Sequence, residues 1–159
     1  MQGDIADVER LLDDPTIDVN WRPPLGGESA LHLAAQSKEN EGTIVRLLLS
    51  HGADPNIATS ESWTPLHWAA YLGKRESVKL LITAGAQVNI QESRFGHTPL
   101  VTAARTGHLD VIQILLESGA DPTIFTKDGR VAYQIALQSQ HPGAADLIRT
   151  YSANNRRPR

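Results

Sequence analysis

The chain has 159 residues, of which 40% are hydrophobic and 21% charged, and this is enough for one ordinary domain with its own core. Its net charge of −3 and its lack of cysteine exclude a polyanion-binding chain, a disulfide framework and a cysteine-ligated zinc site. No apolar run approaches the roughly 18 residues that a membrane span needs, and the N-terminus lacks the pattern of a secretory signal. We therefore expect an intracellular protein, in the cytoplasm, the nucleus or both, without membrane insertion.

The N-terminal stretch is acidic. Six acids fall within residues 1–20 against Arg10 alone, and we interpret them as solvated surface. Residues 1–4 match the turn between two helices in later segments of the chain, so a first repeat over about 1–27 is expected to lack its first helix. On this pattern we expect the chain to be part of a longer protein.

Two sequence elements recur in phase along the chain. The first reads Thr-Pro-Leu-His-Trp-Ala-Ala at 64–70, and its copies begin at Ser29, Thr64, Thr98 and Val131, which lie 35, 34 and 33 residues apart. The second reads Gly-Ala-Asp-Pro-Asn at 52–56 and recurs at 85–89 and 119–123. A leucine-rich apolar run separates the two elements each time. Internal repeats of this length are typical of stacked, solenoid-like folds.

Each part of the repeat that begins at Thr64 has a physical reading. The Thr64 side chain can cap a helix with its oxygen, and Pro65 suits the first helical position, where a missing N–H has no cost. Gly73 ends this helix in a left-handed conformation, and a second helix with apolar residues at helical spacing runs over about 76–83. Gly85 ends the second helix, and a turn-rich stretch leads to the next Thr-Pro. The unit is therefore helix, turn, helix and long hairpin-like loop.

These residues resemble the ankyrin repeat, a family with a period of about 33 residues and a Thr-Pro-Leu-His-x-Ala signature. The resemblance runs from about Gly3 to Tyr151 and is specific, because two motifs recur in phase. It implies an all-α solenoid of about five stacked helix-turn-helix repeats joined by hairpin-like loops, with the first and last repeats incomplete or degenerate. The expected single domain covers 1–151, with repeats at about 1–27 (partial), 28–61, 62–95, 96–128 and 129–151 (a cap), followed by a flexible basic tail over 152–159.

Three departures from the repeat pattern carry expectations of their own. The stretch Gln36–Val45 is two residues longer than its counterparts, which predicts a bulged turn between the helices of the second repeat. The loop Asn89–His97 is one residue longer than its neighbours. In the last repeat Val131-Ala132 replaces Thr-Pro, which suits a terminal cap with less surface to bury.

No catalytic pattern accompanies the repeats. The sequence contains no His-Glu-x-x-His motif, phosphate-binding loop or serine nucleophile elbow, so we predict that the chain is not an enzyme and binds no metal or cofactor. The resemblance implies that His32 and His67 bond within their own repeats and stiffen the stack. His97, His108 and His141 fall at turns, where we expect solvent exposure.

The resemblance also implies where a partner protein or peptide would bind, because ankyrin repeats make contact through the loop fingertips and the end of each first helix, on a concave surface. The candidate contact residues are Glu61, Trp63, Trp68, Tyr71, Leu72, Arg94, Phe95, His97, Arg105, Lys127 and Arg130. Aromatic residues and arginine dominate binding hot spots. Each aromatic residue keeps an alternative to partner contact: for Trp68 it is packing against the neighbouring repeat, and for Trp63 and Phe95 it is anchoring of their own loops.

A basic group of four residues, Arg94, Arg105, Lys127 and Arg130, lies beside the aromatic one, which favours a partner segment that is apolar near Trp63–Tyr71 and acidic toward Lys127. The alternative is that these are ordinary solvated charges. The basic residues form no continuous stripe, so we expect no nucleic-acid partner.

The predicted function is that of an adaptor or scaffold, monomeric as an isolated domain. The alternatives are a kinase inhibitor or a regulator that masks a transcription factor by covering its surface. The resemblance further implies that Asn56 and Asn89 can be hydroxylated by an intracellular oxygenase.

Overall fold

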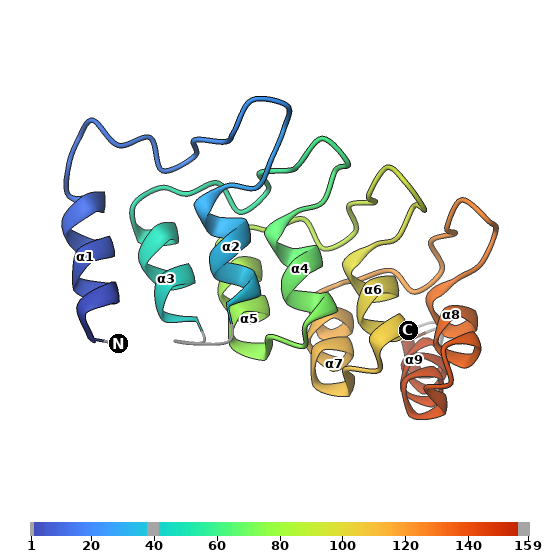
Figure 1. The fold of residues 1–159 in the computed structure, drawn as a ribbon. Coiled ribbons are helices and arrows are strands. Elements are labelled where there is room, and N and C mark those ends of the chain that lie inside the picture. The colour runs from blue at the N-terminus through green and yellow to red at the C-terminus, as the bar shows by residue number, and fades with distance from the viewer. Residues whose placement is uncertain (1, 38–41, 156–159) are drawn as a thin grey trace.

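The computed structural model describes residues 2–37 and 42–155, and its helices in these ranges stand in two rows (Figure 1). The helices are α1 (Gln2–Leu12), α2 (Ala30–Gln36), α3 (Thr43–Ser50), α4 (Pro65–Tyr71), α5 (Arg75–Thr83), α6 (Pro99–Thr106), α7 (Leu109–Glu117), α8 (Ala132–Gln138) and α9 (Pro142–Asn155). The described residues contain no strand.

The inner row consists of α2, α4, α6 and α8, and the outer row of α1, α3, α5, α7 and α9. Each helix contacts the next member of its own row, and α2, α4, α6 and α8 each contact the helix that follows in the chain. The long loops that lead into the inner row project together at the top of Figure 1. The predicted all-α solenoid of helix pairs is confirmed, with α1 as an outer-row helix that precedes the first complete pair.

The inner-row helices begin with the predicted caps. Thr64 Oγ1 accepts the N–H of His67, and Thr98 Oγ1 accepts the N–H of Val101 at 3.2 Å, so each satisfies a backbone donor that has no partner inside its helix. Val131 has no side-chain oxygen. There the amide oxygen of Gln134 accepts the Val131 N–H at 3.0 Å, as Nδ1 of His67 accepts the Thr64 N–H.

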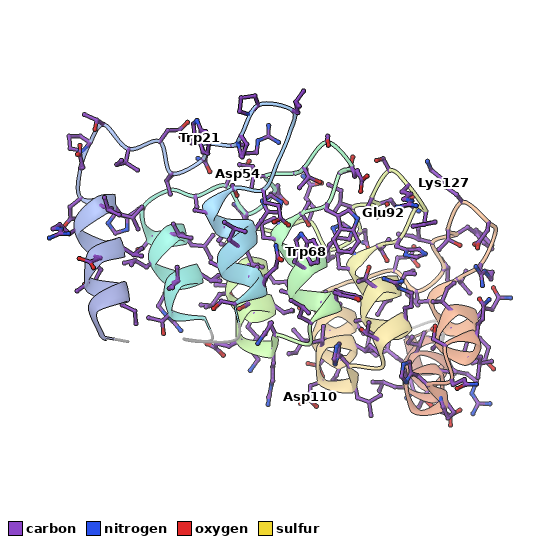
Figure 2. All side chains as sticks on the ribbon, in the orientation of Figure 1. Trp21, Asp54, Trp68, Glu92, Asp110 and Lys127 are labelled. Carbon is purple, nitrogen blue, oxygen red and sulfur yellow. The ribbon has the colours of Figure 1, made fainter. Side chains whose placement is uncertain are left out.

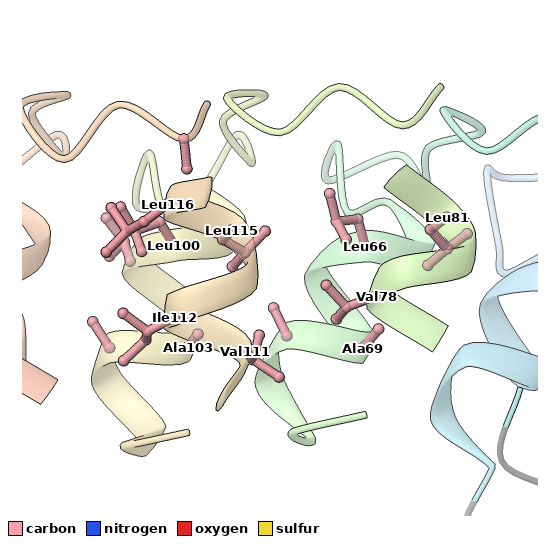
Figure 3. Close-up of a cluster of buried hydrophobic side chains, with 14 of the residues drawn as sticks. Leu66, Ala69, Val78, Leu81, Leu100, Ala103, Val111, Ile112, Leu115 and Leu116 are labelled. Carbon is pink, nitrogen blue, oxygen red and sulfur yellow. The ribbon is translucent and has the colours of Figure 1, made fainter. Parts of the chain in front are cut away.

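The core runs between the two rows and is built from small and branched side chains (Figure 3). In the α4–α5 pair, Leu66, Ala69, Val78 and Leu81 are each 0% exposed. Alanine on the inner helix lets the outer helix approach closely, and the leucines fill the remaining space. Full burial of one such leucine contributes about 1.5–3 kcal/mol to stability, so repetition of this layer holds the loops in fixed positions.

The turns within the helix pairs couple neighbouring repeats. Gly73 has a φ of +69°, and a Cβ on it would lie 2.6 Å from Nδ1 of His108 in the following repeat. His108 Nε2 in turn bonds the Tyr71 carbonyl at 3.0 Å. Gly107 and His141 repeat the close approach, since a Cβ on Gly107 would lie 2.5 Å from Nδ1 of His141. The expected solvent exposure of His108 and His141 is therefore wrong: both are half-buried, because each packs onto the glycine of the preceding turn.

Two further predictions concern the segments that follow α2 and α9. The turn within Gln36–Val45 was predicted to bulge at residues that lie largely at 38–41, outside the described residues. The predicted tail over 152–159 begins too early, because α9 continues through Asn155. Tyr151 Oη donates to the Leu116 carbonyl at 2.7 Å, and Ser152 Oγ to that of Ile148 at 2.8 Å, which holds the last turns in place.

Candidate functional site

Three loops project beyond the inner row and are closed by matching hydrogen bonds. In the Thr59 loop (residues 59–63), the N–H of Thr59 donates to the Trp63 carbonyl at 2.9 Å, and the N–H of Trp63 donates to Thr59 Oγ1 at 3.2 Å. In the Thr126 loop (residues 126–130), the same pair of bonds joins Thr126 and Arg130 at 2.8 and 3.1 Å. In both loops the threonine therefore bonds the residue four positions later and closes the loop.

The Glu92 loop (residues 92–97) reaches the same closure with one more residue. The N–H of Glu92 donates to the His97 carbonyl at 3.0 Å. The Glu92 carboxylate, 1% exposed, accepts the N–H groups of Arg94 and Phe95 at 2.7 Å each and of His97 at 3.0 Å. Burial raises the pKa of Glu92, but these three bonds outweigh it, so the pKa lies below its ordinary value. The longer side chain spans the extra residue that the sequence places in this loop.

Backbone bonds between neighbouring loops fix their spacing. The N–H of Ser60 donates to the Gly26 carbonyl at 2.8 Å. In the same way, the N–H of Ser93 donates to the Glu61 carbonyl and that of Lys127 to the Phe95 carbonyl, each at 2.9 Å. Figure 2 shows Glu92 beside the Lys127 loop and above Trp68 of α4. The loops thus form one continuous edge of the stack.

Two buried histidines tie these loops to the inner row. Nδ1 of His67 accepts the N–H of Thr64 in its own repeat at 3.2 Å, and Nε2 bonds the His97 carbonyl of the next loop at 3.1 Å. His32 makes the equivalent bonds to Ser29 at 3.1 Å and to Trp63 at 3.0 Å. The resemblance implied bonds within one repeat, and the structure adds a second bond that crosses to the next. Burial lowers the pKa of His67 to about 4 and also lowers that of His32.

An aromatic cluster lies where the Thr59 loop meets α4. The ring centroids of Trp63 and Trp68 are 4.8 Å apart, and Tyr71 stands edge-on to Trp68 at 6.1 Å and to Trp63 at 6.4 Å. Trp68 also packs against the core. Its indole N–H is buried and has no acceptor among the described residues. Trp68 thus packs against the core, as the alternative for it had it, and Trp63 holds its loop against α4 through the ring contacts. Both rings also line the face of the molecule.

The four predicted basic residues differ in what their charged groups contact. The guanidinium of Arg94 lies 4.9 Å from the ring centroid of Phe95, and that of Arg105 lies 5.5 Å from the ring centroid of Tyr71. Neither is within ion-pair distance of a carboxylate in the described part of the chain. Arg130, by contrast, pairs with Asp128, and Lys127 Nζ donates to the Ser93 carbonyl.

The aromatic cluster and the arginines surround two adjoining hollows. The first, of about 370 Å³, is lined by seven of the predicted residues: Glu61, Trp63, Trp68, Arg94, Phe95, His97 and Arg105. The second, of about 460 Å³, is lined by Arg130 and shares Phe95, His97 and Arg105 with the first. Tyr71 lies beside the first hollow through its ring contacts, whereas Leu72 and Lys127 line neither hollow.

His97 is a correction to the expected exposure at turns. It is only 8% exposed, because its ring stacks on Phe95 at 5.5 Å and its backbone is bonded to Glu92. Burial and the nearby charge of Arg105 lower the pKa of His97. It forms part of the wall between the hollows.

Sequence reasoning missed Glu92 and Thr59 as the residues that shape these loops. The sequence feature that could have identified them is their position, because each is the first residue of a loop and accepts an N–H from the last residue of that loop. A further hollow, of about 690 Å³, was also missed. It lies on the end face of the last helix pair, lined among others by Phe125, Tyr133 and Ile148.

The asparagines predicted as hydroxylation sites form clamps between repeats. The Asn56 amide donates to the Gly85 carbonyl at 3.1 Å and accepts the Gln87 N–H at 2.8 Å. Asn89 makes the same two bonds to Gly119 and Asp121, at 3.2 and 2.8 Å. Asn20, which the sequence analysis did not single out, clamps the preceding turn in the same way. Hydroxylation of Asn56 and Asn89 stays a prediction.

Membrane spans and metal sites are two other features that the described residues could carry. Within 2–37 and 42–155 no helix is long and apolar enough to cross a membrane. The same residues contain no group of three or more histidine or acidic side chains arranged to hold a metal ion.

Comparison with known proteins identifies the repeat. The family model for ankyrin repeats in three copies matches residues 1–92 and 66–157. Human ankyrin repeat and SOCS box protein 16 is 37% identical over 121 residues, which are 76% of this chain and 26% of that protein. A transient receptor potential cation channel subfamily A member 1 homolog from Caenorhabditis elegans is 35% identical over 119 residues, 75% of this chain and 10% of the relative.

A third relative, the tyrosine-protein kinase HTK16 of Hydra vulgaris, is 29% identical over 150 residues, 92% of this chain and 19% of the kinase. The chain thus spans about a quarter or less of the length of these curated relatives. The helix pairs, the phased motifs and the family match agree, and the chain belongs to the ankyrin-repeat family, whose repeats are non-catalytic modules for protein interaction.

Proposed function

We propose that this chain is an adaptor or scaffold module without catalytic activity of its own, and that it binds a partner protein or peptide on the face formed by α4, α6 and the projecting loops. The observation that carries the proposal is the first hollow, where aromatic rings meet two arginines that pair with no carboxylate in the described part of the chain. Exposed aromatic and arginine side chains of this kind supply most of the free energy of protein association.

The rigidity of this face supports the same proposal. Side-chain and backbone bonds close each loop, link it to its neighbour and tie it to the inner row. A surface that is already ordered loses little conformational entropy when a partner binds. The relatives support it in another way, since a channel, a kinase and a SOCS box protein share the repeat region rather than one activity.

The experiment is a capture assay with the purified chain as bait in a cell lysate, compared with the variant Trp63→Ala/Phe95→Ala/Arg105→Glu. We expect a retained protein that the triple variant loses. The matched control is Lys79→Glu, which changes the charge of an exposed residue on the outer-row helix α5 and should retain it. Circular dichroism of all three proteins checks that the repeat is folded.

Equal retention by the chain and the triple variant would move binding away from this face and contradict the proposal. A kinase inhibitor or a masking regulator would use the same surface for a different result. For a captured enzyme, turnover with and without the chain separates the two functions, because tethering leaves turnover unchanged whereas occlusion lowers it.

A further inference from the structure

We propose that the partner contributes an extended segment in which a large apolar side chain lies within a few residues of a carboxylate. The apolar side chain enters the first hollow, and Arg105, together with Arg94, binds the carboxylate. This inference rests on the proposed function and narrows it to one class of ligand.

The position of Arg105 is the first step. Its side chain is exposed at the end of α6 and lines both hollows, so it stands on the wall between them. Its guanidinium lies over the Tyr71 ring and faces no carboxylate among the described residues. An arginine whose guanidinium stacks on an aromatic ring keeps its N–H donors free, and these donors can bind a carboxylate in a bidentate manner.

The neighbouring basic residues are already engaged. Asp128 neutralises Arg130 at the rim of the second hollow, and the Lys127 ammonium group donates to the backbone of Ser93. A ligand carboxylate would have to displace the Asp128 carboxylate to reach Arg130. The charge available to an anion therefore lies at Arg105 and Arg94, and not toward Lys127, where the sequence pattern had placed it.

The apolar part of the ligand follows from the rings. Trp63 and Trp68 line the first hollow, and so does Phe95, which is 51% exposed. The volume of about 370 Å³ falls within the range of small ligand pockets. A large aliphatic or aromatic side chain fits these surroundings better than a polar one, because it removes the exposed ring surface from water.

A cationic ligand fits the same rings less well. Aromatic clusters attract ammonium groups through their faces, but the guanidiniums of Arg94 and Arg105 already cover the Phe95 and Tyr71 faces. A second cation there would meet two like charges. Glu28 and Glu61 are carboxylates that also line this hollow, and Glu28 accepts a hydrogen bond from the Gln36 amide at 2.7 Å. Both would repel the ligand acid and so direct it toward the Arg105 wall.

The test is a displayed library of random 12-residue peptides, selected on the folded chain and sequenced. We expect enrichment of peptides that carry Asp or Glu within about three residues of a large apolar side chain. For synthetic copies of the enriched peptides, Arg105→Gln should weaken binding about tenfold or more, since a hydrogen-bonded charge is lost. Arg94→Gln should weaken it less, Arg105→Lys should fall between, and binding should weaken as salt rises.

Lys79→Gln on α5 serves as the control and should bind the peptides as the unchanged chain does. The inference is overturned if the enriched peptides lack acids, if basic peptides are enriched, if Arg130→Gln weakens binding more than Arg105→Gln, or if no peptide is enriched. Failure of the proposed function is seen separately, in capture of a folded partner. A partner lost by the triple variant but retained by Arg105→Gln would leave that function standing and remove only this inference.

Discussion

The Thr59 loop and the Glu92 loop occupy equivalent places in successive repeats and reach the same closed shape by different chemistry. The Thr59 loop uses a neutral hydroxyl that accepts one N–H across four residues. The Glu92 loop uses a buried carboxylate that accepts three N–H groups and spans five residues. A histidine of the preceding inner helix, His32 or His67, then anchors the far side of each loop.

The difference shows that the stack preserves a pattern of hydrogen bonds rather than a residue type. One inserted residue moves the closing N–H out of reach of a threonine, and glutamate restores the bond with a longer side chain. The Thr126 loop gives the complementary case. Val101 stands where His32 and His67 stand in the earlier helices and has no ring nitrogen for the Arg130 carbonyl. Thr126 Oγ1 lies 2.9 Å from that carbonyl and 2.5 Å from Oδ1 of Asp128, and its single O–H donates to one of them.

Among the variants that test this comparison, Glu92→Ala should have the largest effect on stability. Three N–H groups lose their acceptor and at least that of His97 is buried, so we expect the free energy of unfolding to fall by about 3 kcal/mol. Urea denaturation followed by circular dichroism measures the change. Because the Glu92 loop carries Arg94 and Phe95, binding on this face should weaken as well.

Two further variants locate the source of that effect. Glu92→Gln keeps the length of the side chain and one acceptor oxygen, and it should cost about half as much as Glu92→Ala. Glu61→Ala, an exposed acid of the neighbouring loop, should change stability by no more than about 0.5 kcal/mol. Equal costs for Glu92→Ala and Glu61→Ala would show that the buried carboxylate does not hold the loop.

Acid pH should loosen the histidine anchors. Burial lowers the pKa of His67 from its ordinary 6.5 to about 4, so protons bind preferentially to the unfolded chain. The stability that His67 contributes is complete above pH 6.5 and is lost as pH falls toward 4. Between pH 7 and pH 5 we expect a loss of about 2 kcal/mol from His67, measured by urea denaturation at each pH.

The chain itself suggests the control for this pH dependence. Gln134 caps α8 with an amide at the position of His67 in α4. His67→Gln should therefore keep a cap for Thr64, lose the bond to the His97 carbonyl and remove the titration. It should be less stable than the unchanged chain at pH 7 but lose less stability on going to pH 5. An unchanged slope would assign the pH dependence to other groups, such as His32 and His97, whose pKa values are also lowered.

The helices and their ends could be predicted because they follow from local chemistry. Thr64 and Thr98 cap, prolines start and glycines end the helices, and each of these effects acts within a few residues. The contact of His108 with Gly73 joins residues 35 positions apart, so a turn histidine was read as exposed. The end of α9 was misjudged for a similar reason, since Tyr151 bonds to Leu116 across 35 residues.

The position of the candidate site could be predicted from the sequence, but the contacts of its individual residues could not. The repeat register alone placed Trp63, Phe95 and Arg105 on one face, and the structure brings them around one hollow. The register does not show which cations are free. The sequence pattern assigned Arg130, in a loop, and Arg105, at the end of α6, to the same basic group. The structure separates them, because Arg130 pairs with Asp128 whereas Arg105 lies over the Tyr71 ring. An acid in a loop likewise reads as solvated surface, which is why Glu92 was overlooked.

The smallest expected effect belongs to the Thr59 loop. Thr59→Ala removes the one side-chain acceptor of the Trp63 N–H, and because Trp63 is only half-buried, water can partly replace it. We expect a loss of about 1 kcal/mol in the free energy of unfolding, with Thr59→Ser close to the unchanged chain. Tryptophan fluorescence during urea denaturation measures both. A loss equal to that of Glu92→Ala would contradict the comparison, because closure by one neutral bond would then stabilise its loop as much as closure by three bonds to a buried charge.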